Sequence, residues 1–199
     1  MSALRDYEVA AWAKQQSICG IDEAGRGPLA GPCVVCGVIL KPNAETGTID
    51  DSKKLSEKAR NEAFELIQTI SEKIIVRIVS IEEIDQYNIY RATQLANESI
   101  AEEAQADLVL TDAMPLTTGY EHLSLIKGDQ RSISIACASI IAKVTRDRIM
   151  VEYDKLYPQY GFAKHKGYPT KAHYEAIEKY GVLPIHRQSF KLYKQVTLF

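Results

Sequence analysis

The sequence has little of what marks secreted or membrane-spanning proteins. Its longest apolar run, Cys33–Leu40, is far shorter than the roughly 20 residues that a transmembrane helix needs. Residues 1–16 mix charged and apolar side chains and contain no hydrophobic signal core. We therefore expect a cytoplasmic protein without membrane contact. Of the 199 residues, 46% are hydrophobic and 25% are charged, which is enough to bury a substantial core.

Cysteine is also scarce, with four in the chain. Cys33 and Cys36 have the C-x-x-C spacing found in many metal and redox sites. They lie in a run that reads as a strand, where residues three apart point to opposite faces and cannot share a metal. Cys19 and Cys137 also have apolar neighbours in the sequence. We expect all four to be buried as small hydrophobic side chains.

The net charge of −2 conceals a difference between the two parts of the chain. Residues 155–199 carry a local charge of +6, which leaves −8 for residues 1–154. The basic segment also holds six of the 11 tyrosines and the histidines His165, His173 and His186. Lysines that meet phosphates and rings that stack on bases fit a nucleic-acid surface, and we expect these histidines at the surface too. The alternative is a solvated amphipathic appendage.

Hydrophobic periodicity predicts alternating strands and helices. Ser80 with Glu83 forms a capping box, and Ser56 can cap another helix. The pattern indicates an α/β core with a mixed sheet flanked by helices over residues 1–155, then a basic, aromatic-rich helical extension over 156–199. Strands are expected at 18–22, 33–40, 73–79, 108–112 and 122–126. Helices are expected at 57–70, after Ser80, and at 89–104, 132–157 and 170–181.

Carboxylates follow two of the predicted strands where each strand ends. Asp22 and Glu23 end the first, Asp112 ends another, and Asp129 lies just before the principal helix. Acids that end a buried strand are costly to leave unpaired, so they usually bind a metal or take part in chemistry. Four carboxylates gathered at one sheet edge would suit two divalent cations acting on a phosphodiester. Taken singly, Asp129 could instead cap the next helix and Asp112 could satisfy a turn.

A glycine-rich turn, Gly25-Arg26-Gly27, comes directly after the first two acids. Glycines allow a backbone to approach something large, such as a sugar-phosphate chain. A G-x-G also opens the dinucleotide-binding fingerprint. Here Pro28 follows at once, the third glycine is one place late at Gly31, and two carboxylates would repel a pyrophosphate. The turn therefore favours a metal-dependent phosphodiester enzyme over a dinucleotide site.

Five blocks of the sequence resemble the motifs of type 2 ribonucleases H, the ribonuclease HII family, and appear in the family's order. They cover the chain from about residue 18 to 190. The departures are Cys137 and Cys36, where the family usually has other small apolar residues. The blocks are residues 20–32, 51–56, 127–129, 138–147 and 165–170.

This resemblance implies a ribonuclease H-like fold and a role for each matching residue. Asp22, Glu23, Asp112 and Asp129 look like the four acids that bind two divalent cations, Mg²⁺ or Mn²⁺. The remaining matches belong to substrate binding. Gly25, Arg26 and Gly27 look like the turn that touches the 2′-hydroxyl of a ribonucleotide, Tyr168 resembles the tyrosine that stacks on the following deoxyribose, and Ser52, Lys53 and Lys143 resemble phosphate contacts.

The resemblance also implies the reaction. The family cuts the phosphodiester on the 5′ side of a ribonucleotide, in RNA–DNA hybrids and at single ribonucleotides in duplex DNA, and leaves 3′-hydroxyl and 5′-phosphate ends. Two alternatives stay open. One is a related nuclease on the same fold, such as a DNA resolvase or a type 3 ribonuclease H. The other is a catalytically silent nucleic-acid or clamp-binding module.

The last five residues, 195–199, resemble the short peptides with which bacterial DNA enzymes bind the sliding clamp. Gln195, Leu198 and Phe199 match the pattern glutamine-x-x-leucine-phenylalanine. Two adjacent apolar residues in a terminal segment usually bury in something. The alternative is that Leu198 and Phe199 fold back onto this protein. No feature of the sequence indicates an oligomer, so we expect a monomer.

Overall fold

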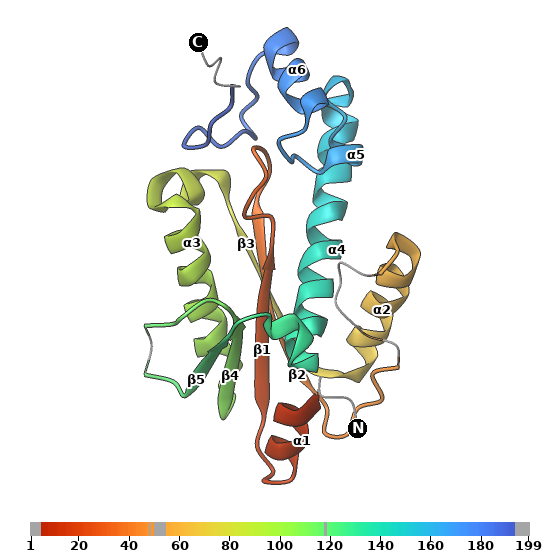
Figure 1. The fold of residues 1–199 in the computed structure, drawn as a ribbon, viewed down its shortest axis with the longest axis vertical. Helices are drawn as coiled ribbons and strands as arrows, with labels where there is room; N and C mark the ends of the chain where they lie inside the picture. Colours follow the sequence, from red (N-terminus) through yellow and green to blue (C-terminus); the bar gives the residue numbers. More distant parts are fainter. Residues whose placement is uncertain (1–4, 48, 50–54, 118, 194–199) are drawn as a thin grey trace.

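A five-stranded sheet forms the centre of the computed structural model, which describes residues 5–47, 49, 55–117 and 119–193 (Figure 1). Its strands are β1 Ile18–Ala24, β2 Cys33–Leu40, β3 Ser71–Val79, β4 Leu108–Asp112 and β5 His122–Leu125. Their order in the sheet is β3-β2-β1-β4-β5. The pairs β1–β2 and β2–β3 are antiparallel, whereas β1–β4 and β4–β5 are parallel. The predicted mixed sheet is therefore confirmed.

Helices surround this sheet. The side chains of Ser56, Ser132 and Thr170 each accept a hydrogen bond from the backbone N–H three residues on, as N-caps do. No helix in the described part of the chain is long and apolar enough to cross a membrane. The helices are α1 Asp6–Trp12, α2 Glu57–Ile70, α3 Ile81–Ala104, α4 Ile133–Leu156, α5 Phe162–His165 and α6 Lys171–Tyr180, with the short 3₁₀ turns η2 Gly128–Gln130 and η3 Pro158–Tyr160.

The two helices predicted between β3 and β4 are joined in the structure as α3. Ser80 and Glu83 form the predicted capping box at its start. Asn88 breaks the helix with φ of 63°, and its side chain accepts hydrogen bonds from the N–H groups of Tyr90 and Arg91. The side chain of Asn88 thereby caps the second segment, so the predicted boundary appears as a kink.

Helices cover both faces of the sheet (Figure 1). α3 packs on one face, while α4 and α2 pack on the other, and every residue of β2 between them is buried. Cys33 belongs to the core on the α3 side and Cys36 to the core on the α4 side. The prediction that this pair points to opposite faces is confirmed. All four cysteines are buried and free of disulfides.

The first helix, α1, has no counterpart among the predicted elements. It carries Glu8, whose side chain is fully buried. Glu8 Oε1 accepts a hydrogen bond from the Ser132 hydroxyl at 2.5 Å and another from the Ser134 N–H at 3.0 Å. A carboxylate is stabilised at a helix N-terminus by the free N–H groups there. Glu8 therefore ties α1 to the beginning of α4.

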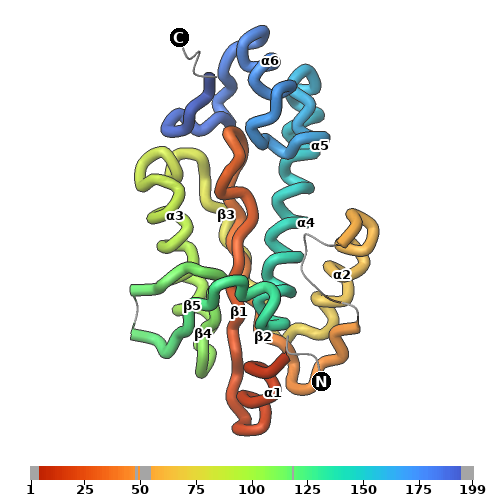
Figure 2. Tube along the Cα trace, viewed as in Figure 1, coloured from red at the N-terminus to blue at the C-terminus, as the bar shows by residue number. Residues whose placement is uncertain are grey.

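The C-terminal segment packs over the far end of α4 and over the connection between β1 and β2 (Figure 2). Its core includes Leu29 and Ala30 from that connection and Met150 from α4, packed with Phe162 and Ile177. This core joins residues on both sides of the boundary expected after residue 155. The division into a catalytic core and an extension stays a prediction.

Candidate active site

Three of the four predicted acids lie where neighbouring strands end. β1 and β4 are parallel, and their register pairs Ile21 with Thr111. Asp22 and Asp112 are the next residues on the two strands, so the backbone places them side by side at one sheet edge. Glu23 follows on β1. This arrangement is the one expected from the strand pattern.

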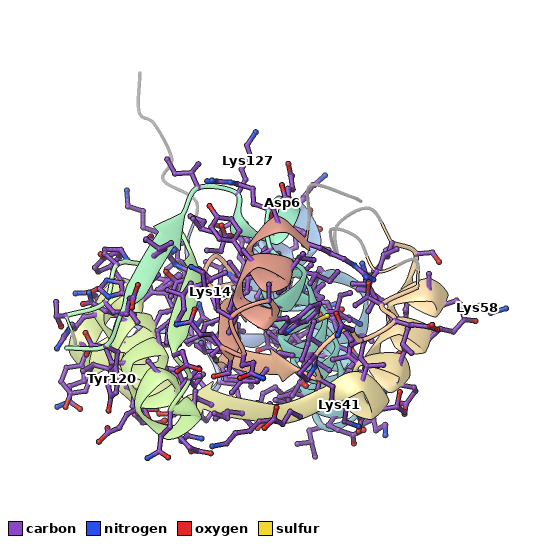
Figure 3. The ribbon with its side chains drawn as sticks, turned by 90° about the horizontal axis from the view of Figure 1, so that it is seen from below. Asp6, Lys14, Lys41, Lys58, Tyr120 and Lys127 are labelled. Carbon is purple, nitrogen blue, oxygen red and sulfur yellow. The ribbon has the colours of Figure 1, made fainter. Side chains whose placement is uncertain are left out.

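The fourth acid, Asp129, reaches this edge through a tight turn. Lys127 begins the turn with φ of 56°, and its side chain points away from the molecule (Figure 3). The N–H of Gly128 donates to Asp112 Oδ1 at 2.8 Å. A Cβ on Gly128 would lie 2.7 Å from Ile135 Cδ1 and 3.4 Å from the Cα of Asp112, so the turn packs closely against both residues. The turn therefore packs against Asp112 and leaves Asp129 buried in η2.

The electrostatics of Asp22 reflect this crowding of carboxylates. Burial raises its pKa well above the ordinary value, and the charges of Glu23 and Asp112 raise it further. Hydrogen bonds from the Ser139 hydroxyl and from the Glu23 N–H, the latter 2.7 Å long, oppose the rise. A nearby cation would favour the charged form of this cluster.

The donor chemistry of these acids fits hard divalent cations, which prefer carboxylate oxygens. In the part of the chain that the structure describes, however, no three acidic, histidine or cysteine side chains converge closely enough to coordinate an ion as they lie. The structure brings Asp22, Glu23 and Asp112 within electrostatic range and links Asp112 to the turn before Asp129. Their role as ligands stays a prediction.

The predicted glycine turn follows β1 and depends on both glycines in different ways. Gly25 has φ of 102°, and a Cβ there would lie 2.1 Å from Arg146 Nε. Gly27 is open: its nearest neighbour would be the Tyr168 ring at 3.7 Å. Arg26 Nη1 lies 3.4 Å from Glu23 Oε1, and the arginine side chain is half-exposed. The turn therefore has one face packed into the protein and one face open beside Tyr168.

Arg187 holds the packed face of this turn. Its side chain is fully buried, although Arg187 belongs to the basic segment 155–199, for which we expect a nucleic-acid surface. Its guanidinium donates to the carbonyl oxygens of Gly25 at 2.7 Å, Arg26 at 3.1 Å and Gly31 at 2.9 Å. Burial lowers its pKa to about 10, which keeps it charged at neutral pH.

A second buried arginine, Arg146 of α4, extends this support. It donates to the carbonyl oxygens of Pro32 at 3.0 Å, Ala30 at 3.1 Å and Lys166 at 3.0 Å. Its guanidinium carbon also lies 5.8 Å from the centroid of the Tyr168 ring. Arg146 therefore connects the β1–β2 connection with the turn that carries Tyr168. Neither arginine was predicted to have this role.

Tyr168 lies on a turn that is bonded directly to the β1–β2 connection. The N–H of Leu29 donates to the Gly167 carbonyl at 2.8 Å. Gly167 has φ of 80°, and a Cβ there would lie 2.4 Å from the Ala30 carbonyl oxygen. The ring of Tyr168 is 42% exposed and faces the open side of Gly27. The glycine turn and Tyr168 thus form one continuous surface.

The remaining predicted contacts differ in how the structure places them. Lys143 lies on α4 one turn after Ser139, which hydrogen-bonds Asp22, and its ammonium is 2.7 Å from Asp147 Oδ1. Other residues named in the sequence analysis fall outside the described part of the chain. These are Ser52, Lys53, Gln195, Leu198 and Phe199.

The expectation of surface histidines is wrong. His173 and His186 are fully buried, and His165 is half-buried. The Nε2 atoms of His173 and His186 lie 3.1 Å apart. Composition alone could not reveal this, because burial depends on which elements the fold packs over the segment. The lysines of the same segment meet the expectation better: Lys155, Lys164, Lys171, Lys179 and Lys191 are exposed.

Comparisons with known proteins agree on one family. The model of the family described as Ribonuclease HII matches residues 19–193. A ribonuclease HII of Clostridioides difficile is 52% identical over 176 residues, which cover 87% of this chain and 69% of that protein. A ribonuclease HII of Francisella philomiragia is 51% identical over 177 residues, which cover 87% of this chain and 96% of that protein.

Solved structures show the same fold. The PCNA:RNase HII complex from Archaeoglobus fulgidus contains a chain with a TM-score of 0.76 and 26% identity, covering 91% of this chain and 98% of that one. A Bst-RNase HIII in complex with Mn²⁺ has a TM-score of 0.58 and 18% identity, covering 83% of this chain and 63% of that one. The second likeness concerns the fold alone.

Proposed function

The chain belongs to the ribonuclease HII family and is a ribonuclease H endonuclease acting on RNA–DNA, and we propose that it cuts on the 5′ side of a ribonucleotide. Its substrates are RNA–DNA hybrids and single ribonucleotides embedded in duplex DNA, its products carry 3′-hydroxyl and 5′-phosphate ends, and its role is ribonucleotide removal. The observation that carries this proposal is the surface shared by the glycine turn and Tyr168, which directly follows the acids of β1.

The turn Gly25-Arg26-Gly27 is proposed to recognise the ribonucleotide. The 2′-hydroxyl is the group that separates RNA from DNA, and backbone N–H and C=O groups can hydrogen-bond it. The buried Arg187 holds the Gly25 and Arg26 carbonyls on the packed side of the turn, and Arg146 holds the chain that follows it, which favours one conformation of the open side. The exposed ring of Tyr168, beside Gly27, is suited to stack on the sugar that follows.

Asp22, Glu23, Asp112 and Asp129 are the proposed holders of two divalent cations, Mg²⁺ or Mn²⁺. When bound, such ions supply Lewis-acid stabilisation of the attacking and leaving oxygens of a phosphodiester. The raised pKa of Asp22 supports this assignment, because burial, and after it the charges of Glu23 and Asp112, disfavour the ionised carboxylate that a bound cation would favour. The ribonuclease HIII named above was solved with Mn²⁺.

Cations outside the acid cluster are proposed to meet the nucleic-acid backbone. Lys143 lies on the same helix as Ser139, one turn from the contact with Asp22, and this position supports its assignment as a phosphate contact. Ser52 and Lys53 have the same proposed role on the basis of the family's motif. The exposed lysines of the C-terminal segment would extend this surface along the duplex.

A labelled DNA duplex that contains one ribonucleotide tests this function, with an all-DNA duplex as the control. We expect a single nick 5′ of the ribonucleotide in Mg²⁺ or Mn²⁺, and the loss of that nick in Asp22→Asn. Cleavage of a long hybrid without any nick at the single ribonucleotide would contradict the proposed substrate range. Activity that persists in Asp22→Asn would contradict the proposed acid cluster.

The proposed protein partner is the bacterial sliding clamp, bound through Gln195, Leu198 and Phe199. The ribonuclease HII of Archaeoglobus fulgidus was solved in complex with PCNA, which supports a clamp as the partner class. Deletion of residues 195–199 should abolish binding to the purified clamp and leave nicking of a short duplex unchanged. Equal clamp affinity of the full and shortened chains would refute this partner.

A further inference from the structure

Three histidines lie together where the C-terminal segment meets the β1–β2 connection. The rings of His165 and His173 stack with centroids 4.6 Å apart, and those of His173 and His186 lie 5.2 Å apart. Phe162 packs edge-on against His173. Because His173 and His186 are fully buried, they can act on the substrate only through other residues.

The hydrogen bonds assign one tautomer to each ring of the buried pair. His173 Nδ1 lies 3.0 Å from the Tyr168 carbonyl oxygen, which only accepts, so this nitrogen donates. In a neutral ring the other nitrogen then accepts, and the His186 Nε2 at 3.1 Å must be its donor. His186 Nδ1 lies 2.9 Å from the Leu183 N–H, which only donates, and 3.3 Å from the Leu183 carbonyl oxygen, so the shorter contact makes this nitrogen an acceptor. Burial lowers the pKa of both imidazoles, which keeps them neutral at pH 7.

All four ring nitrogens of His173 and His186 thus have a partner within the protein. Neither ring offers a free nitrogen to act as a general base or to bind an ion. The pair instead forms a directed chain that runs from the Leu183 N–H, through both rings, to the carbonyl oxygen of Tyr168. Its structural role is to hold the turn that carries Tyr168.

The backbone of His186 connects this chain to the glycine turn. His186 forms a β-bridge with Ala30, and the N–H of Arg187 donates to the Leu29 carbonyl at 2.9 Å. The next side chain, that of Arg187, reaches the carbonyls of Gly25 and Arg26. His186 therefore connects the hydrogen bonds that hold Tyr168 with the backbone that positions Arg187 against the glycine turn.

We propose that His173 and His186 are positioning residues that set the Tyr168 ring relative to the Gly25-Arg26-Gly27 turn. The distance between the Tyr168 ring and the turn decides how well the enzyme recognises a ribonucleotide followed by a deoxyribonucleotide. The proposal rests on the proposed function, in which the turn reads the ribonucleotide and Tyr168 reads the next sugar. It assigns the histidines to substrate discrimination, and not to the hydrolysis step.

Two substitutions of His173 separate this role from general packing. The amide nitrogen of asparagine lies close to the position of histidine Nδ1, whereas that of glutamine lies close to Nε2. His173→Asn therefore keeps a donor to the Tyr168 carbonyl, and His173→Gln loses it. Tyr168→Ala, which removes the ring itself, is the reference variant. The measured quantity is the ratio of kcat/KM on a single-ribonucleotide duplex to kcat/KM on a long RNA–DNA hybrid.

We expect His173→Gln to lower this ratio about ten- to hundredfold, the scale of a misplaced substrate contact. His173→Asn should stay within about twofold of the unchanged enzyme, because it retains the hydrogen bond to Tyr168. A His173→Gln enzyme that keeps the ratio while Tyr168→Ala loses it would overturn the proposal. An unchanged ratio in Tyr168→Ala would also overturn the proposal, because it would show that the Tyr168 ring does not recognise the sugar after the ribonucleotide. If the unsubstituted chain nicks neither substrate, the proposed function itself fails.

A second pair of variants and a spectroscopic measurement cover the case in which His173→Gln does not fold. His186→Gln keeps a donor toward His173, whereas His186→Asn loses it and no longer fixes the His173 tautomer that donates to Tyr168. An asparagine at position 173 carries its amide donor whatever residue stands at 186, so His186→Asn should lower the ratio although His173→Asn does not. Nitrogen-15 spectra of the unchanged protein at pH 7 should show a proton on Nδ1 of His173 and on Nε2 of His186. The opposite tautomers would overturn the proposal without any activity measurement.

Discussion

The guanidinium of Arg187 donates to the carbonyl oxygen of Gly25 at 2.7 Å, although 162 positions of the chain separate the two residues. Two further carbonyls, those of Arg26 and Gly31, accept from the same side chain. A buried cation is costly unless its donors are satisfied, and a turn rich in unpaired carbonyls is costly as well. The arginine and the turn therefore stabilise each other.

This geometry predicts that lysine cannot replace Arg187. A lysine ammonium is a compact charge without the planar fork that reaches three carbonyls at once. Arg187→Lys should lower the free energy of unfolding by about 3 kcal/mol or more, since it leaves buried polar groups unpaired. Urea denaturation measures this change. Arg26→Lys, at a half-exposed arginine of the same turn, is the matched control and should change stability little. Equal stability of the two variants would contradict this account.

The two glycines of the turn should respond differently to alanine. Gly25→Ala adds a Cβ that would lie 2.1 Å from Arg146 Nε, at a backbone φ of 102° that disfavours side chains. Gly27→Ala adds one only 3.7 Å from the Tyr168 ring, an ordinary contact. Thermal melts should show a clear loss of stability in Gly25→Ala alone. If substrate binds across the open face, Gly27→Ala should keep its fold and show a raised KM. A Gly27→Ala enzyme with unchanged KM would argue against that face.

Removal of the charge at Asp22 should stabilise the metal-free protein. Its pKa is raised in the folded state, so between the ordinary value of 3.8 and the raised value the folded chain holds more protons than the unfolded chain. Stability then falls as pH rises through that range. Asp22→Asn should gain about 0.5–2 kcal/mol at neutral pH in the presence of a chelator, and lose activity.

Thermal melts with and without Mg²⁺ or Mn²⁺ test this prediction. The unchanged protein should gain stability when the metal is added, and Asp22→Asn should gain much less. An Asp22→Asn protein that melts below the unchanged chain in chelator would show that the carboxylate is already well compensated without metal.

The buried histidines predict a loss of stability in mild acid. Burial, followed by the neighbouring imidazoles, lowers the pKa of His173 from 6.5 to about 4. The unfolded chain therefore takes up a proton below about pH 6.5, while the folded chain does so only below about pH 4. Neutral His173 causes no loss of stability above pH 6.5. As the pH approaches 4, its protonation in the unfolded chain lowers the free energy of unfolding by up to about 3 kcal/mol.

Urea denaturation between pH 4.5 and 7.5 measures this decline. His173→Asn cannot take up the proton, so its stability should fall less steeply over the same range. His186, whose pKa is also lowered by burial, adds to the decline in both proteins. Equal slopes for the two proteins would show that His173 does not contribute.

Much of the fold could be predicted because its signals are local. The bounds of β2 and β4 follow from short apolar runs, and Ser56 and Thr170 mark helix starts by their side chains alone. The acids could be assigned to one edge because parallel strands end together. The strand and helix bounds depend on patterns a few residues long, whereas the shared edge of the acids follows from a general rule for parallel strands.

The supports of the candidate site could not be predicted in this way. Arg187 and His173 sit among exposed lysines in the sequence, and nothing in their immediate neighbours distinguishes them from surface residues. Their burial comes from the packing of the C-terminal segment on Leu29 and Ala30, more than 140 positions earlier in the chain. Glu8 is a similar case, because its partners Ser132 and Ser134 lie on α4. Such roles require the tertiary structure.

The contact between Gly25 and Arg187 has a consequence for the order of events during synthesis. β1 and its acids emerge from the ribosome early, but the carbonyls of the glycine turn wait for a guanidinium that is translated 162 residues later. A nascent or prematurely terminated chain that lacks residue 187 can contain every carboxylate of the cluster and still lack the ordered turn. The carboxylates and the guanidinium that supports the glycine turn are thus separated in time during synthesis, so an incomplete chain has the acids without the support of the turn.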